Sequence, residues 1–169
     1  PGMQVIVPGT SKEFDVLFNT CYNNGSPTYY RLSERENSES HDVEFGKANV
    51  LKRGKLATIV VIGPMLKNVL EASKGLDVTI IYYTTVTPFD EKTLKENLSG
   101  NRIILCEPFY EGGISGDVIN ALRSIPIAIE FIGIPKKFLP NYGKATDHDN
   151  ALGLTVEKIS ERIKNIING

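Results

Sequence analysis

Cysteine, histidine and tryptophan are scarce in this sequence, and the scarcity excludes several kinds of site. The chain has two cysteines, two histidines and no tryptophan among 169 residues. Cys21 and Cys106 are isolated thiols that form neither a disulfide framework nor a zinc site, so we expect both to be reduced and structural. His41 has no partner at a useful spacing. His148 stands between two aspartates, a sequence that could bind a metal, but a solvated loop is the favoured interpretation and no metal site is predicted.

Long apolar runs and an excess of charge of one sign are also missing. No run approaches the roughly 20 apolar residues that span a bilayer, and the start, PGMQVIVPGT, lacks the features of a signal peptide. The 19 basic and 20 acidic residues leave a net charge of -1, which gives no basic surface for nucleic acid. We therefore expect a cytoplasmic protein without a nucleic-acid or membrane partner. No G-x-S-x-G elbow supports a serine nucleophile either.

What the sequence does contain is an alternation of apolar runs and helical stripes. Strands are predicted at 3–7, 28–32, 48–54, 55–63, 77–83, 102–107 and 125–134. Helices are predicted at 11–22, 64–74, 88–98, 116–122 and 156–166. This strand–helix–strand order indicates right-handed crossovers and a mostly parallel sheet covered on both faces. The stretch 135–153 shows no period and is predicted to be irregular.

The ends of several predicted helices carry capping signals. Thr10 and Glu13 have the spacing of a capping box in front of the first helix. Thr87 is predicted to cap the third helix, Ser115 the fourth and Thr155 the last.

A polar run separates two structural units. Residues 33–47, SERENSESHDVEFGK, are charged and have no hydrophobic period, which is typical of a linker. We place the domain boundary near Phe45.

Seven segments, in this order, resemble the C-terminal part of a transketolase. They are PGMQVIVPGTSKEFD, GSPTYYRLSE, GKANVLKRGKLATIVVIG, TVTPFD, CEPFYEGGISGDV, IEFIGIPKKF and GLTVEKI. The same order is similar to the wider group of thiamine diphosphate enzymes, which includes deoxyxylulose phosphate synthase and the beta subunits of 2-oxoacid dehydrogenases. No single segment is highly specific; the resemblance depends on their order over nearly the whole chain.

This resemblance implies an α/β fold with a three-layer α/β/α arrangement. It implies a mostly parallel five-stranded sheet with one antiparallel strand, preceded by a partial α/β segment. Residues 1–45 would be the tail end of the pyrimidine-binding domain, and residues 46–169 the transketolase C-terminal domain.

The resemblance also implies what the chain needs from elsewhere. The full enzyme would use thiamine diphosphate and a divalent metal, whereas this chain has neither the diphosphate-binding motif nor the segment with the activating glutamate. We expect the isolated chain to bind no cofactor and to be inactive. Its expected partners are the missing N-terminal domains or subunit, a second copy in a homodimer, and a sugar phosphate substrate.

The end of the second predicted strand is the candidate substrate contact. The resemblance implies that Arg31, Ser33 and Arg35 bind the phosphate of a sugar, and a guanidinium suits such an anion. Glu34 stands where related sequences have a second arginine, and its carboxylate would repel a phosphate unless Arg35 substitutes or the substrate differs. The alternative is that Arg31, Glu34 and Arg35 form a solvated ion-pair cluster of small energetic value.

The glycine-rich segment 111–116, EGGISG, is the second candidate. Glycines before a helix can expose N–H groups to an anion, but the spacing matches neither a Rossmann fingerprint nor a P-loop. The resemblance favours a turn near a subunit contact, with Gly112 and Gly113 at the interface. Glu107 is then an interface or loop-anchoring carboxylate.

Two functions remain after these observations. In the first, the chain belongs to an enzyme that transfers a two-carbon ketol unit between sugar phosphates, and it supplies scaffold, dimer contact and a substrate-anion contact. The alternative is a non-catalytic docking domain of a 2-oxoacid dehydrogenase beta-type subunit, or part of a deoxyxylulose phosphate synthase. The segments PTYYRLSE and TVTPFD favour the first.

Overall fold

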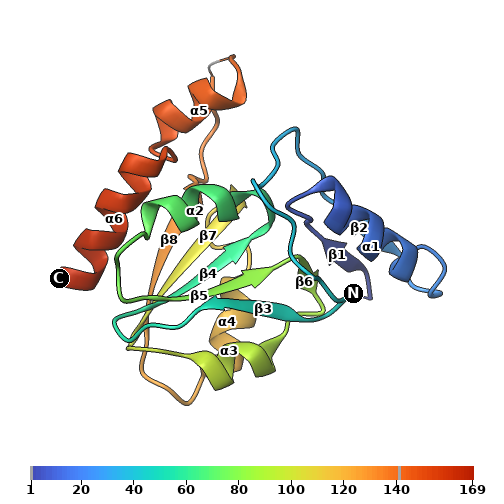
Figure 1. Ribbon diagram of the computed structural model, residues 1–169, viewed down its shortest axis with the longest axis horizontal. Coiled ribbons are helices and arrows are strands. Elements are labelled where there is room, and N and C mark those ends of the chain that lie inside the picture. Colours follow the sequence, from blue (N-terminus) through green and yellow to red (C-terminus); the bar gives the residue numbers. More distant parts are fainter. Residues whose placement is uncertain (1, 141) are drawn as a thin grey trace.

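The computed structural model describes residues 2–140 and 142–169, and its centre is a five-stranded sheet (Figure 1). The strand order is β3-β5-β4-β7-β8. Strands β4, β5, β7 and β8 are parallel, and only β3 at one edge is antiparallel to its neighbour. The strands are β3 (Ala48–Lys52), β4 (Thr58–Ile62), β5 (Thr79–Tyr83), β7 (Arg102–Tyr110) and β8 (Ala128–Ile134). The predicted sheet, including its single antiparallel strand, is confirmed.

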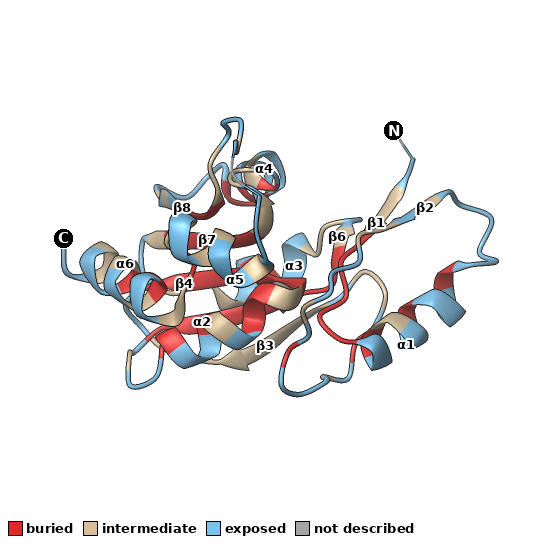
Figure 2. Cartoon of the chain, turned by 90° about the horizontal axis from the view of Figure 1, so that it is seen from above, coloured by how far each residue is buried: buried red, intermediate tan, exposed pale blue. Residues whose placement is uncertain are grey.

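Helices cover both faces of this sheet. On one face lie the short turn η1 (Gly63–Met65), α2 (Leu66–Ala72) and the terminal α6 (Val156–Asn168), and on the other lie α3 (Glu91–Asn97) and α4 (Ser115–Leu122). Alternate residues of β4 divide between the two cores: Ile59 and Val61 pack toward α2 and α6, whereas Val60 and Ile62 pack toward α3 and α4. Figure 2 shows the central strands buried between helices whose outer faces are exposed.

A second, smaller sheet has the order β2-β1-β6. Strands β1 (Gln4–Ile6) and β2 (Thr28–Tyr30) are parallel and are joined through helix α1 (Ser11–Cys21), whereas β6 (Thr85–Thr87) pairs antiparallel with β1. Strand β6 lies far along the chain from β1. The N-terminal segment is therefore joined to the rest of the protein by backbone hydrogen bonds.

Helix α1 begins as the sequence predicts and differs in one detail. The hydroxyl of Thr10 accepts the N–H of Glu13 at 3.2 Å. The carboxylate of Glu13 accepts the N–H of Gly9, at 2.8 Å, in place of the N–H of Thr10 that closes an ordinary capping box. Of the predicted stripe, Leu17 and Cys21 are buried, whereas Phe18 is 39% exposed.

Three local predictions are wrong. Helix α3 is capped by Asp90, whose carboxylate accepts the N–H of Thr93 at 3.0 Å, because Thr87 is the last residue of strand β6. Ser115 is the first residue of α4 rather than its cap, and its hydroxyl donates to the carbonyl of Gly112. The stretch predicted to be irregular contains helix α5 (Ala145–Leu152).

Among the residues that the structure describes, no helix is long and apolar enough to cross a bilayer.

Candidate functional site

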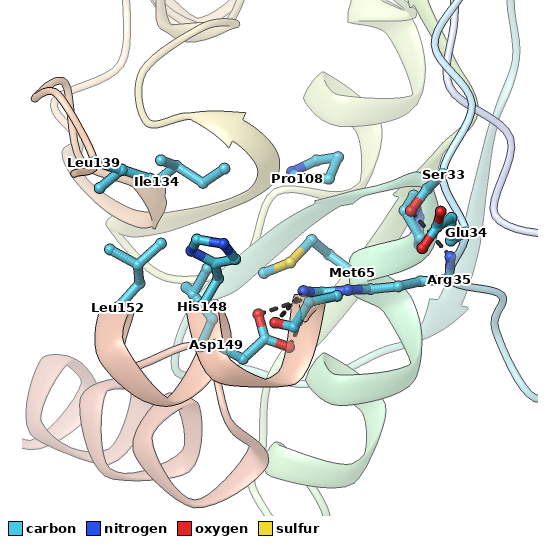
Figure 3. A pocket seen from close by; sticks show the side chains of 13 residues that line it. Ser33, Glu34, Arg35, Met65, Pro108, Ile134, Leu139, His148, Asp149 and Leu152 are labelled. Atoms are coloured by element: carbon cyan, nitrogen blue, oxygen red, sulfur yellow. Dashed lines mark hydrogen bonds and ion pairs between the residues drawn. The ribbon is translucent and has the colours of Figure 1, made fainter. Parts of the chain in front are cut away.

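The predicted substrate contacts lie on the segment that leaves β2, beside a groove of about 380 Å³. The N–H of Arg31 still donates to the carbonyl of Ile6, after which the chain turns toward the larger sheet. Ser33, Glu34 and Arg35 form one wall of the groove, and α5 forms the opposite wall (Figure 3). The other lining residues are mainly apolar: Pro64, Met65, Pro108, Ile134, Leu139, Ala145, His148, Asp149, Leu152 and Leu154.

The groove lies at the carboxyl ends of three parallel strands. Pro64 and Met65 follow β4, Pro108 is near the end of β7, and Ile134 is the last residue of β8. The helices that follow β4 and β7 pack on opposite faces of the sheet, so the chain reverses its winding between these two neighbouring strands. Open parallel sheets bind their ligands outside the carboxyl ends of the strands at such a reversal.

The guanidinium of Arg35 is held by helix α5. Its Nη1 lies 2.8 Å from both carboxylate oxygens of Asp149, and its Nη2 donates to the carbonyl of Ala145 at 2.7 Å (Figure 3). The two side chains are 35% and 15% exposed, so the ion pair is partly shielded from water. Arg35 thereby fixes the end of the N-terminal segment to the far wall of the groove.

The guanidinium of Arg31 also contacts protein atoms. Its Nη2 donates to the carbonyl of Pro108 at 3.3 Å, and its central carbon lies 5.7 Å from the centre of the Phe109 ring. A cation over an aromatic face is attracted by the ring quadrupole. Arg31, Ser33 and Pro108 line a small cavity of about 70 Å³ beside the main groove.

Ser33 and Glu34 occupy the rim between two cavities. The hydroxyl of Ser33 accepts the N–H of Arg35 at 3.1 Å and so shapes the turn. Glu34 is exposed, and within the described residues it takes part in no side-chain hydrogen bond or ion pair. The second cavity, of about 290 Å³, shares residues 33–35 with the first and is otherwise lined by residues 8–11, Phe14, Leu32 and Glu36.

The structure thus brings Ser33 and Arg35 together at the groove and places Arg31 at the adjoining small cavity, which Ser33 and Pro108 also line. The alternative ion-pair cluster among Arg31, Glu34 and Arg35 does not form, because both arginines bind other partners. A role of the three predicted residues in binding substrate stays a prediction.

Glu107 anchors the glycine-rich loop. This residue is fully buried, and its carboxylate accepts the N–H groups of Gly112 at 2.5 Å and Ile114 at 2.9 Å. Burial raises the pKa of Glu107, and the hydrogen bonds from the loop only partly offset that effect. Gly112 has a positive φ of 79°, which favours glycine, and a Cβ on Gly113 would lie 2.6 Å from the Phe109 ring. A subunit contact through Glu107, Gly112 and Gly113 stays a prediction.

Sequence reasoning missed the α5 side of the groove. His148 and Asp149 line it, although the sequence suggested only a solvated loop there. The partner of Asp149 lies 114 residues earlier in the chain, and no local pattern signals a pair at that separation. Within the described part of the chain, no group of three or more His, Cys, Asp or Glu side chains is placed to hold a metal ion.

The sequence of this chain is similar to those of several known proteins. The chain matches the family model "Transketolase, C-terminal domain" over residues 46–159. It is 31% identical over 172 residues to an "Uncharacterized 33.6 kDa protein in fasciation locus" of Rhodococcoides fascians, with 99% of this chain and 55% of that protein covered. It is 28% identical over 183 residues to 1-deoxy-D-xylulose-5-phosphate synthase of Dictyoglomus thermophilum, with 99% of this chain and 29% of that protein covered. The chain thus spans about half or less of the length of these relatives.

Solved structures agree with the sequence comparison. A split-gene transketolase, described as an inactive beta4 tetramer, has a TM-score of 0.83 and 26% identity, with 99% of this chain and 58% of that chain covered. A transketolase of Pichia stipitis in complex with sedoheptulose-7-phosphate has a TM-score of 0.71 and 16% identity, with 99% of this chain and 25% of that chain covered. The second likeness shows the fold alone. The family model matches residues 46–159, which make up most of the chain and include all strands of the five-stranded sheet. This chain therefore belongs to the transketolase C-terminal domain family.

Proposed function

We propose that this chain is the C-terminal part of a thiamine diphosphate enzyme that transfers a two-carbon ketol unit between sugars, with sugar phosphates as the substrates that the sequence predicts. In this proposal residues 1–45 complete a pyrimidine-binding domain, and residues 46–169 form the C-terminal domain. The chain supplies scaffold, a contact between two copies, and substrate contacts from residues 31–35.

The observation that carries the proposal is the likeness to a split-gene transketolase over 99% of this chain at a TM-score of 0.83. That likeness includes the N-terminal segment with its own small sheet, which the family match over residues 46–159 does not cover. Fold alone does not decide function, so the proposal also uses the sequence match to the transketolase C-terminal domain model over residues 46–159.

Thiamine diphosphate and its metal are assigned to polypeptide other than this chain. The described residues offer no carboxylate, histidine or thiol cluster suited to the metal. When bound, the cofactor supplies the stabilisation of negative charge that breaking and forming carbon–carbon bonds beside a carbonyl requires. The residues of this chain would hold the neighbouring domains in place and shape the outer part of the substrate channel.

Decarboxylating synthesis of a deoxyxylulose phosphate is the second candidate. The 28% identity to 1-deoxy-D-xylulose-5-phosphate synthase over 99% of this chain favours it. The two reactions differ in the donor, because the synthase consumes pyruvate and releases carbon dioxide whereas ketol transfer starts from a ketose.

The test is reconstitution of the complete enzyme. This chain would be co-expressed with the polypeptide that carries the diphosphate-binding motif, and the purified complex supplied with thiamine diphosphate, Mg²⁺, a ketose donor and an aldose acceptor. Mass spectrometry should detect a ketose two carbons longer than the aldose acceptor, and this chain alone should give none. Because synthesis of a deoxyxylulose phosphate also adds two carbons to an aldose, the donor separates the two candidates. A 1-deoxy ketose and carbon dioxide that form only when pyruvate replaces the ketose donor would favour the synthase. The absence of a lengthened product from either donor would contradict both candidates.

A further inference from the structure

The electrostatics of the 31–35 segment narrow the class of substrate. Both of its arginines are turned to protein partners: Arg35 to Asp149 and the Ala145 carbonyl, and Arg31 to the Pro108 carbonyl and the Phe109 ring. A phosphate is usually bound by guanidinium groups that present two parallel N–H donors to it. The Nη1 of Arg35 already binds the carboxylate of Asp149, and its Nη2 binds the carbonyl of Ala145, so both terminal nitrogens of this guanidinium have protein partners.

Carboxylates outnumber cations in the two larger cavities that meet at this segment, whereas the small cavity of about 70 Å³ has Arg31 as its only charged lining residue among those that the structure describes. In the groove, Glu34 and Asp149 face the single cation Arg35. In the second cavity, Glu34 and Glu36 accompany Arg35. No lysine is among the lining residues of either cavity. The carboxylate of Glu34, which has no side-chain partner within the described residues, is thus an uncompensated negative charge on the rim that both cavities share.

The apolar side chains that line the groove also disfavour the binding of a phosphate. Met65, Pro108, Ile134, Leu139 and Leu152 offer no hydrogen-bond donors to a charged oxygen from their side chains. Moving a dianion out of water to such a wall is unfavourable without compensating cations. A carbon-rich or neutral group loses little by the same transfer, and an ammonium group would gain a charge-assisted contact with Glu34.

From these observations we infer that Glu34 selects neutral or amino-substituted sugars as substrates. The part of the substrate that lies beside residues 31–35 then carries no phosphate. The inference rests on the proposed ketol transfer and replaces sugar phosphates by unphosphorylated sugars as its substrate class. Asp149 contributes by keeping the Arg35 guanidinium away from the substrate.

The first experiment compares acceptors on the reconstituted enzyme. Ribose, ribose 5-phosphate and an amino-deoxy aldose would be assayed with one ketose donor. Because a like charge placed beside an uncompensated carboxylate is strongly disfavoured, kcat/KM should be about tenfold or more lower for ribose 5-phosphate than for ribose. Glu34→Gln should narrow this ratio, and Glu34→Arg should reverse it, mainly through KM. Glu39→Gln, an exposed carboxylate of the same segment that lines neither cavity, should leave the ratio unchanged.

A second experiment does not depend on turnover. Inorganic phosphate would be titrated into the wild-type protein and the Glu34→Arg variant by calorimetry, with the expectation that the variant binds phosphate about tenfold or more tightly than the wild type. Transfer to ribose 5-phosphate that exceeds transfer to ribose and is unchanged in Glu34→Gln would overturn the inference while leaving ketol transfer intact. Transfer to no acceptor would overturn the proposed function, and the inference with it.

Discussion

The hydroxyl of Tyr82 on β5 donates a 2.7 Å hydrogen bond to the carboxylate of Glu13 on α1, so that the larger sheet and the N-terminal segment share a buried polar contact. The same carboxylate accepts the N–H groups of Gly9 at 2.8 Å and His41 at 3.0 Å. Hydrogen bonds from several donors compensate a buried carboxylate for the loss of its water. When one donor is removed, part of the free-energy cost of burying the charge is no longer compensated. The contact therefore specifies how the two parts of the chain fit together.

We predict that Tyr82→Phe lowers the free energy of unfolding by about 1.5–3 kcal/mol, because the variant removes a hydrogen bond to a buried charged group. Urea denaturation followed by circular dichroism would measure the change. Tyr29→Phe is the matched control: Tyr29 is 48% exposed, and its change should stay within about 0.5 kcal/mol. Equal effects of the two substitutions would contradict a stabilising role for the Glu13 contact.

Glu107 should make stability fall as the pH rises. Burial raises the pKa of this carboxyl above its ordinary value of 4.5. The folded state then keeps the proton at pH values where the unfolded chain has lost it. The stability that Glu107 contributes is therefore fully present below pH 4.5 and declines as the pH rises through the folded pKa. Unfolding free energies would be measured between about pH 4 and pH 8. The stability of Glu107→Gln relative to wild type should increase over this range, whereas Glu111→Gln in the same loop should show no such trend.

Asp90 should have the opposite effect. Burial favours its neutral form, but hydrogen bonds from the hydroxyl and N–H of Thr93 and from the N–H of Ala48 outweigh burial and hold the pKa below 3.8. Stability from this group is present above pH 3.8 and is lost as the pH falls through the folded pKa. The advantage of wild type over Asp90→Asn should therefore shrink during acid titration. Asp77→Asn, at an exposed position, is the control, and a constant advantage down to about pH 2 would contradict the prediction.

The sequence predicts the strands of the larger sheet because most are continuous apolar runs, and buried parallel strands have that composition. The terminal helix α6 is predicted for a similar reason, since Ile159 and Ile163 keep a helical period and are buried. Strand β6 is not predicted, because it has three residues and its pairing with β1 is a long-range contact.

Helix α5 escapes prediction for a different reason. None of its residues is buried, so it has no apolar stripe, and it is attached to the N-terminal segment by the ion pair between Arg35 and Asp149. The groove depends on that helix for one wall. Local sequence could thus predict residues 31–35 as a candidate site but not the group that faces them.

We predict that Asp149→Ala loosens α5. The variant removes the ion pair with Arg35, and because no residue of the helix is fully buried, the contacts that remain include the partly buried Leu152 and the hydrogen bond to the Ala145 carbonyl. Hydrogen exchange of the α5 N–H groups should become about 3- to 10-fold faster, while exchange in β4 and β7 stays unchanged. Asn150→Ala, at an exposed neighbouring position, should not accelerate exchange. Unchanged protection of α5 in Asp149→Ala would show that the ion pair does not hold the helix.

Self-association through the glycine-rich loop is tested at Gly116. We predict that sedimentation velocity detects a dimer of this chain, as a contact through Gly112 and Gly113, in the loop that the buried Glu107 anchors, requires. A Cβ on Gly116 meets no heavy atom within 4 Å, so Gly116→Arg adds bulk and charge to this surface without disturbing the fold. The variant should sediment as a monomer with an unchanged circular dichroism spectrum, whereas Gly75→Asn, at a turn with positive φ and open space, should remain dimeric. A Gly116→Arg variant that stays dimeric would place the contact between copies elsewhere on the molecule.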